Sequence, residues 1–327
     1  MRKRTSFFKN YFLLLSIFLA LSWALSASAY TIEKLPDVAV EKDFTVGPAQ
    51  NEVFLDPGAE ATKNLMVTSR LGKTTSFIIT LEDFKGTTTG ETSALLLGGE
   101  RNGPYSLIDY LKPETTEFTL NHGERIALPI KISIPADAEP GGRYGAVLVS
   151  ITNPVEIKSQ EGEVVGGINV TGRVAALYLV RVRGDVEEDG FLREIRTVGP
   201  KKWFYDKGPI SLELLFENRG SVHLNLYGVI EIRNLFNKKV GEIKLDPWFA
   251  MPQSLRSRVV KFDRSLLFGR YTALASINRG YDDIVDQKSV NFWVIPWKFL
   301  AAGIIILGLF AFLLRWLLSK VEIRVKR

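Results

Sequence analysis

The stretch that decides the fold is Arg-Ile-Ala-Leu-Pro-Ile-Lys-Ile-Ser-Ile, residues 125–134, which has the most regular hydropathy pattern in the chain. Its large apolar residues fall at every second position: Ile126, Leu128, Ile130, Ile132 and Ile134. Side chains two apart lie on one face of a strand, so the pattern predicts a half-buried β-strand with Ile130 and Ile132 in a core. Pro129 has no N–H to give to a neighbour, so it predicts an edge strand or a bulged one.

Further short β patterns lie on both sides of this stretch. Lys63–Ser69 and Thr75–Phe84 are rich in β-branched and aromatic residues and predict neighbouring antiparallel strands. Arg143–Thr152 is apolar on both faces, which predicts a central strand, and Gly166–Arg183 is another long β-rich run. No convincing amphipathic helix interrupts these patterns. Short, regularly spaced strands of this kind are typical of a β-sandwich.

A second set of alternating segments follows the polar turn Glu187–Gly190. Within it, the run Gly269–Ile277 repeats the pattern of Gly142–Ile151, including a shared Gly-Arg-Tyr, which predicts that one type of domain occurs twice. The shared tyrosine is expected to bond back to a loop, as a tyrosine corner does. The sequence therefore predicts an all-β protein with two immunoglobulin-like β-sandwiches in tandem, residues 30–184 and residues 185–296.

The C-terminal end predicts one transmembrane α-helix, residues 297–318. No charged residue occurs from Phe299 to Leu314, and the run continues to Leu318, about 30 Å of helix at ~1.5 Å per residue. Tryptophans flank the run, as aromatic residues do at membrane interfaces. The tail after it, residues 319–327, is mostly basic, which predicts that it lies in the cytoplasm.

The N-terminal end reads as a signal peptide, residues 1–29. Basic residues are followed by an apolar segment too short for a comfortable membrane span, and then by Ala27-Ser28-Ala29, a small-x-small cleavage site. Ala27 and Ala29 are the small residues of this site, and we expect cleavage directly after Ala29. The alternative is an uncleaved N-terminal anchor. Either way, the sequence predicts a single-pass cell-membrane protein with its N-terminus and ectodomain outside and its C-terminus inside.

The amino-acid composition excludes several classes of function. The net charge of +6 suggests a nucleic-acid partner, but the positive charge is concentrated in the two membrane segments, and the part between them is net negative. No basic footprint for nucleic acid remains there. The chain has no cysteine, which excludes disulfides, thiolate metal sites and cysteine nucleophiles. The exported part must therefore rely on its hydrophobic cores alone.

Residues 43–184 resemble the first domain of the WxL-interacting proteins of Gram-positive cell surfaces. The resembling motifs, in chain order, are Phe44–Pro48, Leu55–Gly58, the strand pair Leu65–Phe84, Tyr105–Tyr110, Pro140–Gly145 and Gly172–Val180. The signal peptide and the C-terminal helix with a basic tail also fit that family. The resemblance implies immunoglobulin-like domains and, for the first domain, peptidoglycan binding. It assigns no individual binding residue, and the second domain matches only in position and class.

The sequence offers little catalytic chemistry. His122 lies in a predicted turn and His223 beside a predicted strand, and neither belongs to a metal-binding or catalytic motif, so both read as surface polar residues. Asp282, Asp283 and Asp286 lack the spacing of an EF-hand and read as a solvated turn. We therefore expect no enzyme activity, no catalytic residue, no metal and no cofactor. A wall-active hydrolase would need a carboxylate pair that the sequence does not reveal.

The stretch Gly86–Pro104 fits no period, and loops of this length are often functional. It contains the apolar trio Leu95, Leu96 and Leu97 and is followed by Tyr105 and Tyr110. We hypothesise that these five residues belong to a binding surface; the alternative is that the leucines fold back over the first sandwich. The expected function is binding of cell-wall glycan or a partner surface protein. The alternative is an assembly role resembling that of the pilus chaperones, which capture a client strand on a sheet edge.

Overall fold

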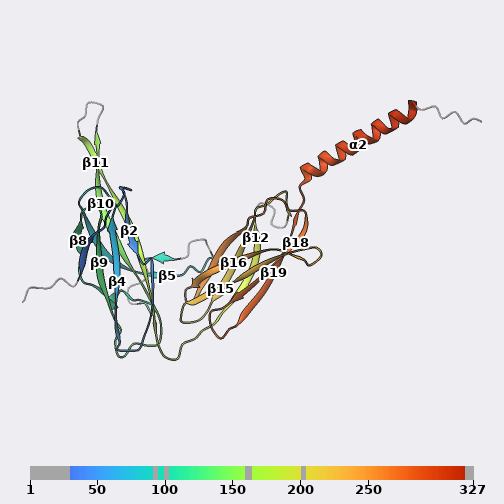
Figure 1. Ribbon diagram of the computed structural model, residues 1–327. Coiled ribbons are helices and arrows are strands. Elements are labelled where there is room, and N and C mark those ends of the chain that lie inside the picture. The colour runs from blue at the N-terminus through green and yellow to red at the C-terminus, as the bar shows by residue number, and fades with distance from the viewer. Residues whose placement is uncertain (1–29, 91–94, 99–102, 159–163, 200–203, 321–327) are drawn as a thin grey trace, which may run out of the picture.

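A computed structural model describes residues 30–90, 95–98, 103–158, 164–199 and 204–320 (Figure 1). The predicted signal peptide with Ala27 and Ala29, and the basic tail after Lys320, lie outside the described residues. Within residues 152–171, which belong to two strands and their connection, only the backbone of the strands is described.

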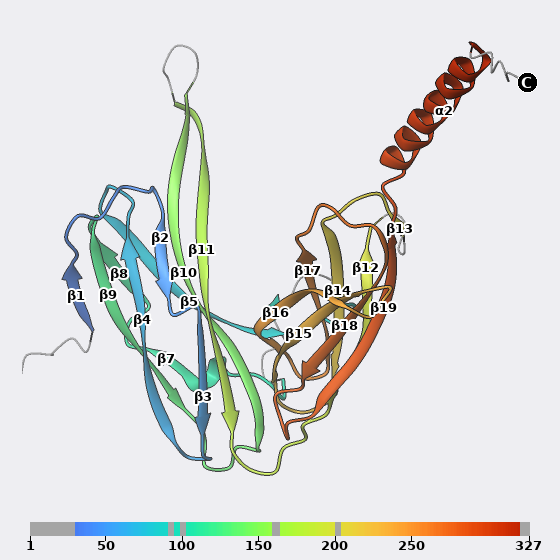
Figure 2. The same ribbon diagram turned by 45° about the vertical axis from the view of Figure 1, so that its right-hand side comes forward.

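Two sheets build the first sandwich (Figure 2). One has the order β1 (Thr31–Lys34), β9 (Glu124–Ser133), β4 (Glu60–Ser69), β2 (Phe44–Gly47), with β7 (Leu111–Pro113) also on β9. The other, called here the hairpin sheet, has the order β3 (Gln50–Leu55), β11 (Val164–Val182), β10 (Gly141–Lys158), β5 (Thr75–Lys85), β6 (Leu96–Leu97), with β8 (Glu117–Leu120) also on β5. The short helix η1 (Ile108–Tyr110) precedes β7.

The strand β9 is an interior strand of its sheet, and its pairing with β4 has no bulge, so the predicted edge or bulged strand is wrong. Pro129 is tolerated because β1 pairs only as far as Ala127, and β7 begins pairing only at Ile130. The missing N–H of Pro129 therefore falls between two neighbours and removes no ladder hydrogen bond. The predicted apolar face is confirmed, because Ile130 and Ile132 are fully buried in the core of the first sandwich.

The second sandwich is built the same way from two further sheets. Its smaller sheet has the order β12 (Gly190–Val198), β14 (Ile210–Asn218), β17 (Ser254–Phe262). Its larger sheet has the order β13 (Phe204–Tyr205), β19 (Val285–Val294), β18 (Gly269–Asn278), β15 (Leu224–Asn234), β16 (Lys239–Ala250). A separate hydrophobic core fills the space between them. The predicted fold class, two β-sandwiches and a C-terminal helix, is confirmed.

The two copies of the repeated run occupy equivalent places, β10 and β18, each in the interior of its sheet. Their tyrosines, however, have different roles. The Tyr271 hydroxyl bonds both backbone groups of Phe268, three residues upstream, as a local corner contact would. The Tyr144 hydroxyl instead bonds His223 in the other sandwich.

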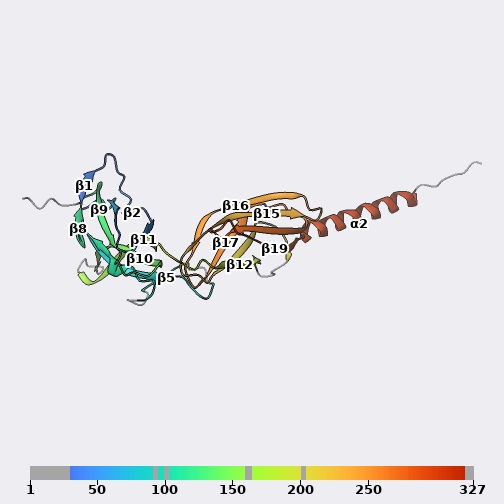
Figure 3. The ribbon, with the colours of Figure 1, turned by 90° about the horizontal axis from the view of Figure 1, so that it is seen from below.

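One helix, α2 (Trp297–Lys320), follows β19 and leaves the second sandwich at the end remote from the first (Figure 3). Within the described residues, it is the only helix long and apolar enough to cross a membrane, over Ala301–Ser319, and that segment is not buried against the rest of the protein.

Candidate partner-binding site

The longest strand pair of the protein is the hairpin β10–β11, which projects beyond the first sandwich (Figure 2). Its ladder runs from Gly141 paired with Val182 to Lys158 paired with Val164. The strand β5 pairs with β10 only over Gly145–Ser150, and β3 pairs with β11 only over Leu177–Val182. After Ser150 on β10 and before Leu177 on β11, no described strand pairs with the outer edge of the hairpin.

The backbone of β11 shows which of its groups face the open edge. The N–H of Leu177 donates to the Ala49 carbonyl at 2.9 Å, and the N–H of Arg183 donates to the Leu55 carbonyl at 2.8 Å, both toward β3. Because strand backbone groups alternate and the ladder is regular from Gly166, the odd-numbered residues have their N–H and C=O groups on that side. Asn169, Thr171 and Arg173 therefore direct backbone groups to the edge that β3 leaves open.

The two edges of the hairpin differ in one respect. On β10, residues with even numbers direct their backbone groups away from β11, and one of them is Pro154, paired with Asn169. Proline has no N–H, and natural proteins use it to block an exposed edge. The described part of β11 contains no proline. The edge of β11 is therefore the one able to accept an added strand.

The base of the hairpin is packed against the second sandwich. An apolar cluster, called here the interdomain cluster, lies on the outer face of the hairpin sheet. Its buried members are Phe84, Tyr144, Ala146, Leu179 and Met251, and Leu95, Tyr105, Ala175, Leu177 and Phe249 pack around them. Met251 and Phe249 come from the second sandwich, so the cluster joins the two domains beside the strands that form the hairpin.

A hydrogen-bonded chain crosses the same interface. The Tyr144 hydroxyl accepts the backbone N–H of His223 at 2.7 Å and lies 3.1 Å from Nδ1 of the same residue, to which it can donate. Nε2 of His223 is 2.9 Å from a carboxylate oxygen of Glu52 on β3. In this network Tyr144 contacts one ring nitrogen of the imidazole and Glu52 contacts the other, so both nitrogens have a partner.

The environment changes the acidity of both partners. Burial raises the pKa of the Tyr144 hydroxyl, since its ionised form would be poorly solvated. The hydrogen bond from His223 lowers the pKa of Glu52 below its ordinary value, against the opposing effect of partial burial. The prediction that His223 is a surface residue is wrong: it is 5% exposed, because the contact between sandwiches covers it. Sequence alone could not show a contact between segments so far apart.

Asp83 holds the loop that carries Tyr105. One carboxylate oxygen accepts the backbone N–H groups of Leu107 and Ile108 at 2.9 and 3.2 Å, and the other accepts the Ser106 hydroxyl at 2.6 Å. Asp83 is buried, so these three donors compensate for its lost hydration. No local pattern predicts this role, because an aspartate within a strand finds such partners only in a distant segment.

The five predicted binding residues separate in the structure. Leu95 packs partly buried in the interdomain cluster, whereas Leu96 and Leu97 form β6, pair with β5 and are about half exposed. Tyr105 is partly buried with its ring 6.2 Å from that of Tyr144. Tyr110 packs instead against the core of the first sandwich. Residues 91–94 and 99–102 of this loop lie outside the described part, and a contact role for the exposed leucines stays a prediction.

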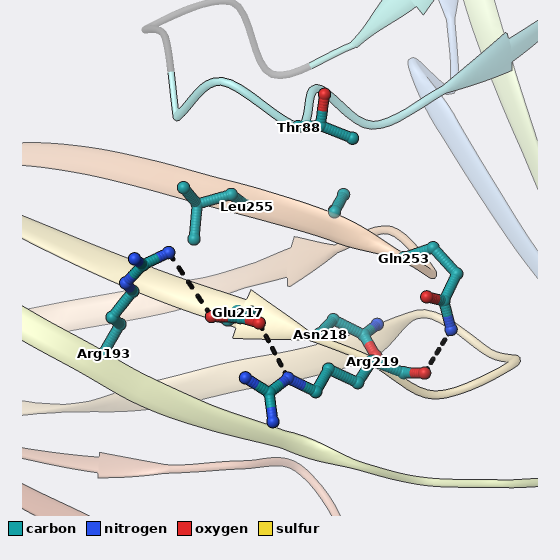
Figure 4. Close-up of a pocket in the computed structure, with 8 residues that line it drawn as sticks. Thr88, Arg193, Glu217, Asn218, Arg219, Gln253 and Leu255 are labelled. Carbon is teal, nitrogen blue, oxygen red and sulfur yellow. Dashed lines mark hydrogen bonds and ion pairs between the residues drawn. The ribbon is translucent and has the colours of Figure 1, made fainter.

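Two small pockets lie near the interface. One, of about 210 Å³, is lined by Asp83–Lys85 and Gly103–Ser106. The other, of about 190 Å³, lies between Thr88 and the second sandwich (Figure 4). In it, the Glu217 carboxylate lies 3.5 Å from the guanidinium group of Arg193 and 2.7 Å from that of Arg219 (Figure 4). The carboxylate is therefore already paired with two positive charges.

No group of three or more His, Asp or Glu side chains is arranged to hold a metal ion in the residues that the structure describes. His223 and Glu52 come together, but both serve the contact between the sandwiches. The residues described above offer open backbone groups on β11 and an apolar cluster beside the hairpin.

No family model and no curated protein matches the chain. Among solved structures, it is similar to the class 5 fimbriae chaperone CfaA, with 11% identity and a TM-score of 0.34 over 78% of this chain and 100% of that chain. It is also similar to the E. coli chaperone DraB, with 12% identity and a TM-score of 0.31 over 77% and 97% of the two chains. The third is the Pseudomonas aeruginosa CupB2 chaperone, with 8% identity and a TM-score of 0.33 over 76% of this chain and 100% of that chain.

Proposed function

We propose that this protein is a membrane-anchored, non-enzymatic binding protein that captures an extended segment of a partner protein as an added strand on β11. The observation that supports this most directly is the open edge of β11 beyond Leu177, where β3 stops pairing. The predicted assembly role is thus preferred over the predicted glycan-binding role.

The physical argument is that an open edge offers unpaired N–H and C=O groups in a fixed row. An extended peptide can satisfy them with its own backbone, which gives affinity, while side-chain contacts give specificity. Soluble proteins usually protect such edges, because unprotected ones pair with any available strand. Pro154 protects the β10 side, and β11 is left open.

A glycan-binding role has less support among the described residues. Sugar-binding proteins stack exposed aromatic faces on sugar rings, but Tyr105 and Tyr110 are both partly buried and packed against apolar neighbours. The resemblance to the WxL-interacting proteins, with its implied peptidoglycan binding, stays a prediction.

The proposed location is the cell membrane, with α2 as a single-pass anchor and the sandwiches outside. Support comes from the apolar length of α2 and from the basic residues that follow it in the sequence. The partner would then be another exported or surface protein.

The test compares two substitutions at Thr171 in the full-length protein. Thr171→Pro removes an N–H that faces the open edge, and Thr171→Ala removes the same side chain but keeps the N–H. We expect Thr171→Pro to lose the partner and Thr171→Ala to keep it, with equal melting temperatures, since that N–H has no partner within the described ladder.

Capture is measured in cells by a photo-cross-linking amino acid placed at Arg173, with the cross-linked peptide identified by mass spectrometry. Hydrogen exchange should also slow on binding at alternate residues of β11. Strand addition would be contradicted if the Thr171→Pro and Thr171→Ala variants captured the partner equally. Cross-links at position 173 that persist in the Thr171→Pro variant would contradict it as well.

A further inference from the structure

The end of the second sandwich that adjoins α2 has an unusual surface. The pairs Asn234–Tyr271, Ile210–Phe262 and Gly269–Val294 place the end of β15, the end of β17 and the end of β19 together. The connections 235–238 and 263–268 therefore project from the same end of the sandwich from which α2 leaves (Figure 2).

These two connections expose large apolar side chains. In the described part of the second sandwich, the four large apolar residues with the highest exposed fractions are Leu235 (61%), Phe236 (85%), Leu266 (75%) and Phe268 (64%). Single exposed apolar residues are common, but four on neighbouring loops at one end are the kind of apolar surface that marks an interaction site. We call these four residues the apolar tips.

The chain itself brings this patch to a membrane. The N–H of Ile295 still donates to Tyr205 of β13 at 2.9 Å, and α2 begins at Trp297, so only Pro296 separates the sandwich from the helix. The apolar segment of α2 begins at Ala301, about 6 Å further along the helix at ~1.5 Å per residue. That distance is comparable to one headgroup layer, about 5–8 Å thick. A bilayer that holds α2 therefore meets this end of the sandwich.

The charged and aromatic residues around the tips fit a lipid surface. Lys207, Lys238 and Arg270 are exposed and make no ion pair with a described carboxylate. Asp206 and Asp263 are exposed acids nearby, and the exposed Glu242 is paired with Lys239. Cations near a membrane surface are attracted to anionic headgroups. Trp293 and Trp297 are also exposed at this end, and tryptophan prefers the interface between headgroups and hydrocarbon.

We propose that the apolar tips insert into the headgroup region of the bilayer that α2 spans, so that the second sandwich docks on the membrane surface instead of moving freely above it. This goes beyond strand capture and does not depend on it, but it does rest on α2 being inserted. Docking would hold the hairpin of the first sandwich in a restricted orientation to the membrane.

The test uses the full-length chain, which has no native cysteine. Phe236→Cys and Leu266→Cys are labelled with an environment-sensitive fluorophore and reconstituted in phosphatidylcholine–phosphatidylglycerol vesicles that contain nitroxide-labelled lipid. Val285→Cys is the matched control, because Val285 is an exposed apolar residue at the opposite end of the same sandwich. We expect lipid nitroxides to quench the labels at 236 and 266 and to leave the label at 285 unquenched.

Quenching at 236 and 266 no greater than at 285 would overturn the proposal. A blue-shifted emission without quenching, dependent on the protein-to-lipid ratio, would assign the tips to a second copy of the chain and overturn it too. Extraction of the protein by alkaline carbonate would show that α2 is not inserted, which removes the basis of the docking but leaves strand capture open.

Discussion

Tyr144 shows how one residue takes its role from its surroundings. It shares the Gly-Arg-Tyr pattern with Tyr271, yet its hydroxyl serves the other sandwich, where it satisfies the backbone N–H and Nδ1 of His223. Tyr144 and His223 are each at most 5% exposed. No water can replace a bond lost there without a change of structure, so this contact should be costly to remove.

We expect Tyr144→Phe to lower the free energy of unfolding by about 1–3 kcal/mol, because it leaves two buried groups of His223 unsatisfied. Tyr178→Phe is the matched control: Tyr178 is fully buried, but its hydroxyl has no hydrogen-bond partner among the described residues. Its removal should be neutral or stabilising. Urea denaturation of the full-length protein in detergent measures both, and an equal loss for the two variants would refute the role of the Tyr144 hydroxyl.

At the scale of elements, β9 and the β10–β11 hairpin illustrate opposite uses of a strand. The strand β9 has neighbours on both sides and buries a whole apolar face. The hairpin extends beyond its neighbours and keeps part of its backbone unpaired. The first arrangement stabilises the fold, and the second leaves hydrogen-bonding capacity for another chain.

Truncation of a side chain on the buried face of β9 should therefore lower the free energy of unfolding substantially. We expect Ile130→Ala to cost roughly 2–5 kcal/mol through lost burial and the cavity it leaves. Ile78→Ala on β5 removes the same groups from a side chain that is 41% exposed, so its cost should be clearly smaller. Denaturant midpoints compare the two, and similar shifts would mean that Ile130 does not support the core as its burial indicates.

At the scale of the whole molecule, the segment after β5 ties the sandwiches together. The N–H of Leu255 on β17 donates to the Thr87 carbonyl at 2.8 Å. Just before Thr87, Gly86 lies so close to the second sandwich that a Cβ would come within 2.6 Å of the Ser254 hydroxyl and 2.8 Å of the Met251 side chain. Only glycine fits there without a shift of one sandwich against the other.

Gly86→Ala should consequently loosen this contact and speed hydrogen exchange at the Leu255 amide. Gly47→Ala is the control, since a Cβ at Gly47 meets no atom within 4 Å. Hydrogen-exchange mass spectrometry of the peptide that contains Leu255 provides the measurement. Unchanged exchange in Gly86→Ala would show that the two sandwiches are held in place without this segment.

The amino-acid sequence by itself determined the β-sandwich class, the buried face of residues 126–134 and the apolar C-terminal helix, because these depend on periodicity and length within single segments. Only the tertiary structure decided that β9 is interior, that His223 is buried against Tyr144 and Glu52, and that Leu95 and Tyr110 pack in different clusters. The open edge of β11 and the apolar tips beside α2 belong to the same group. Each depends on which distant strands pair and where that pairing stops, and local sequence preferences do not encode such contacts.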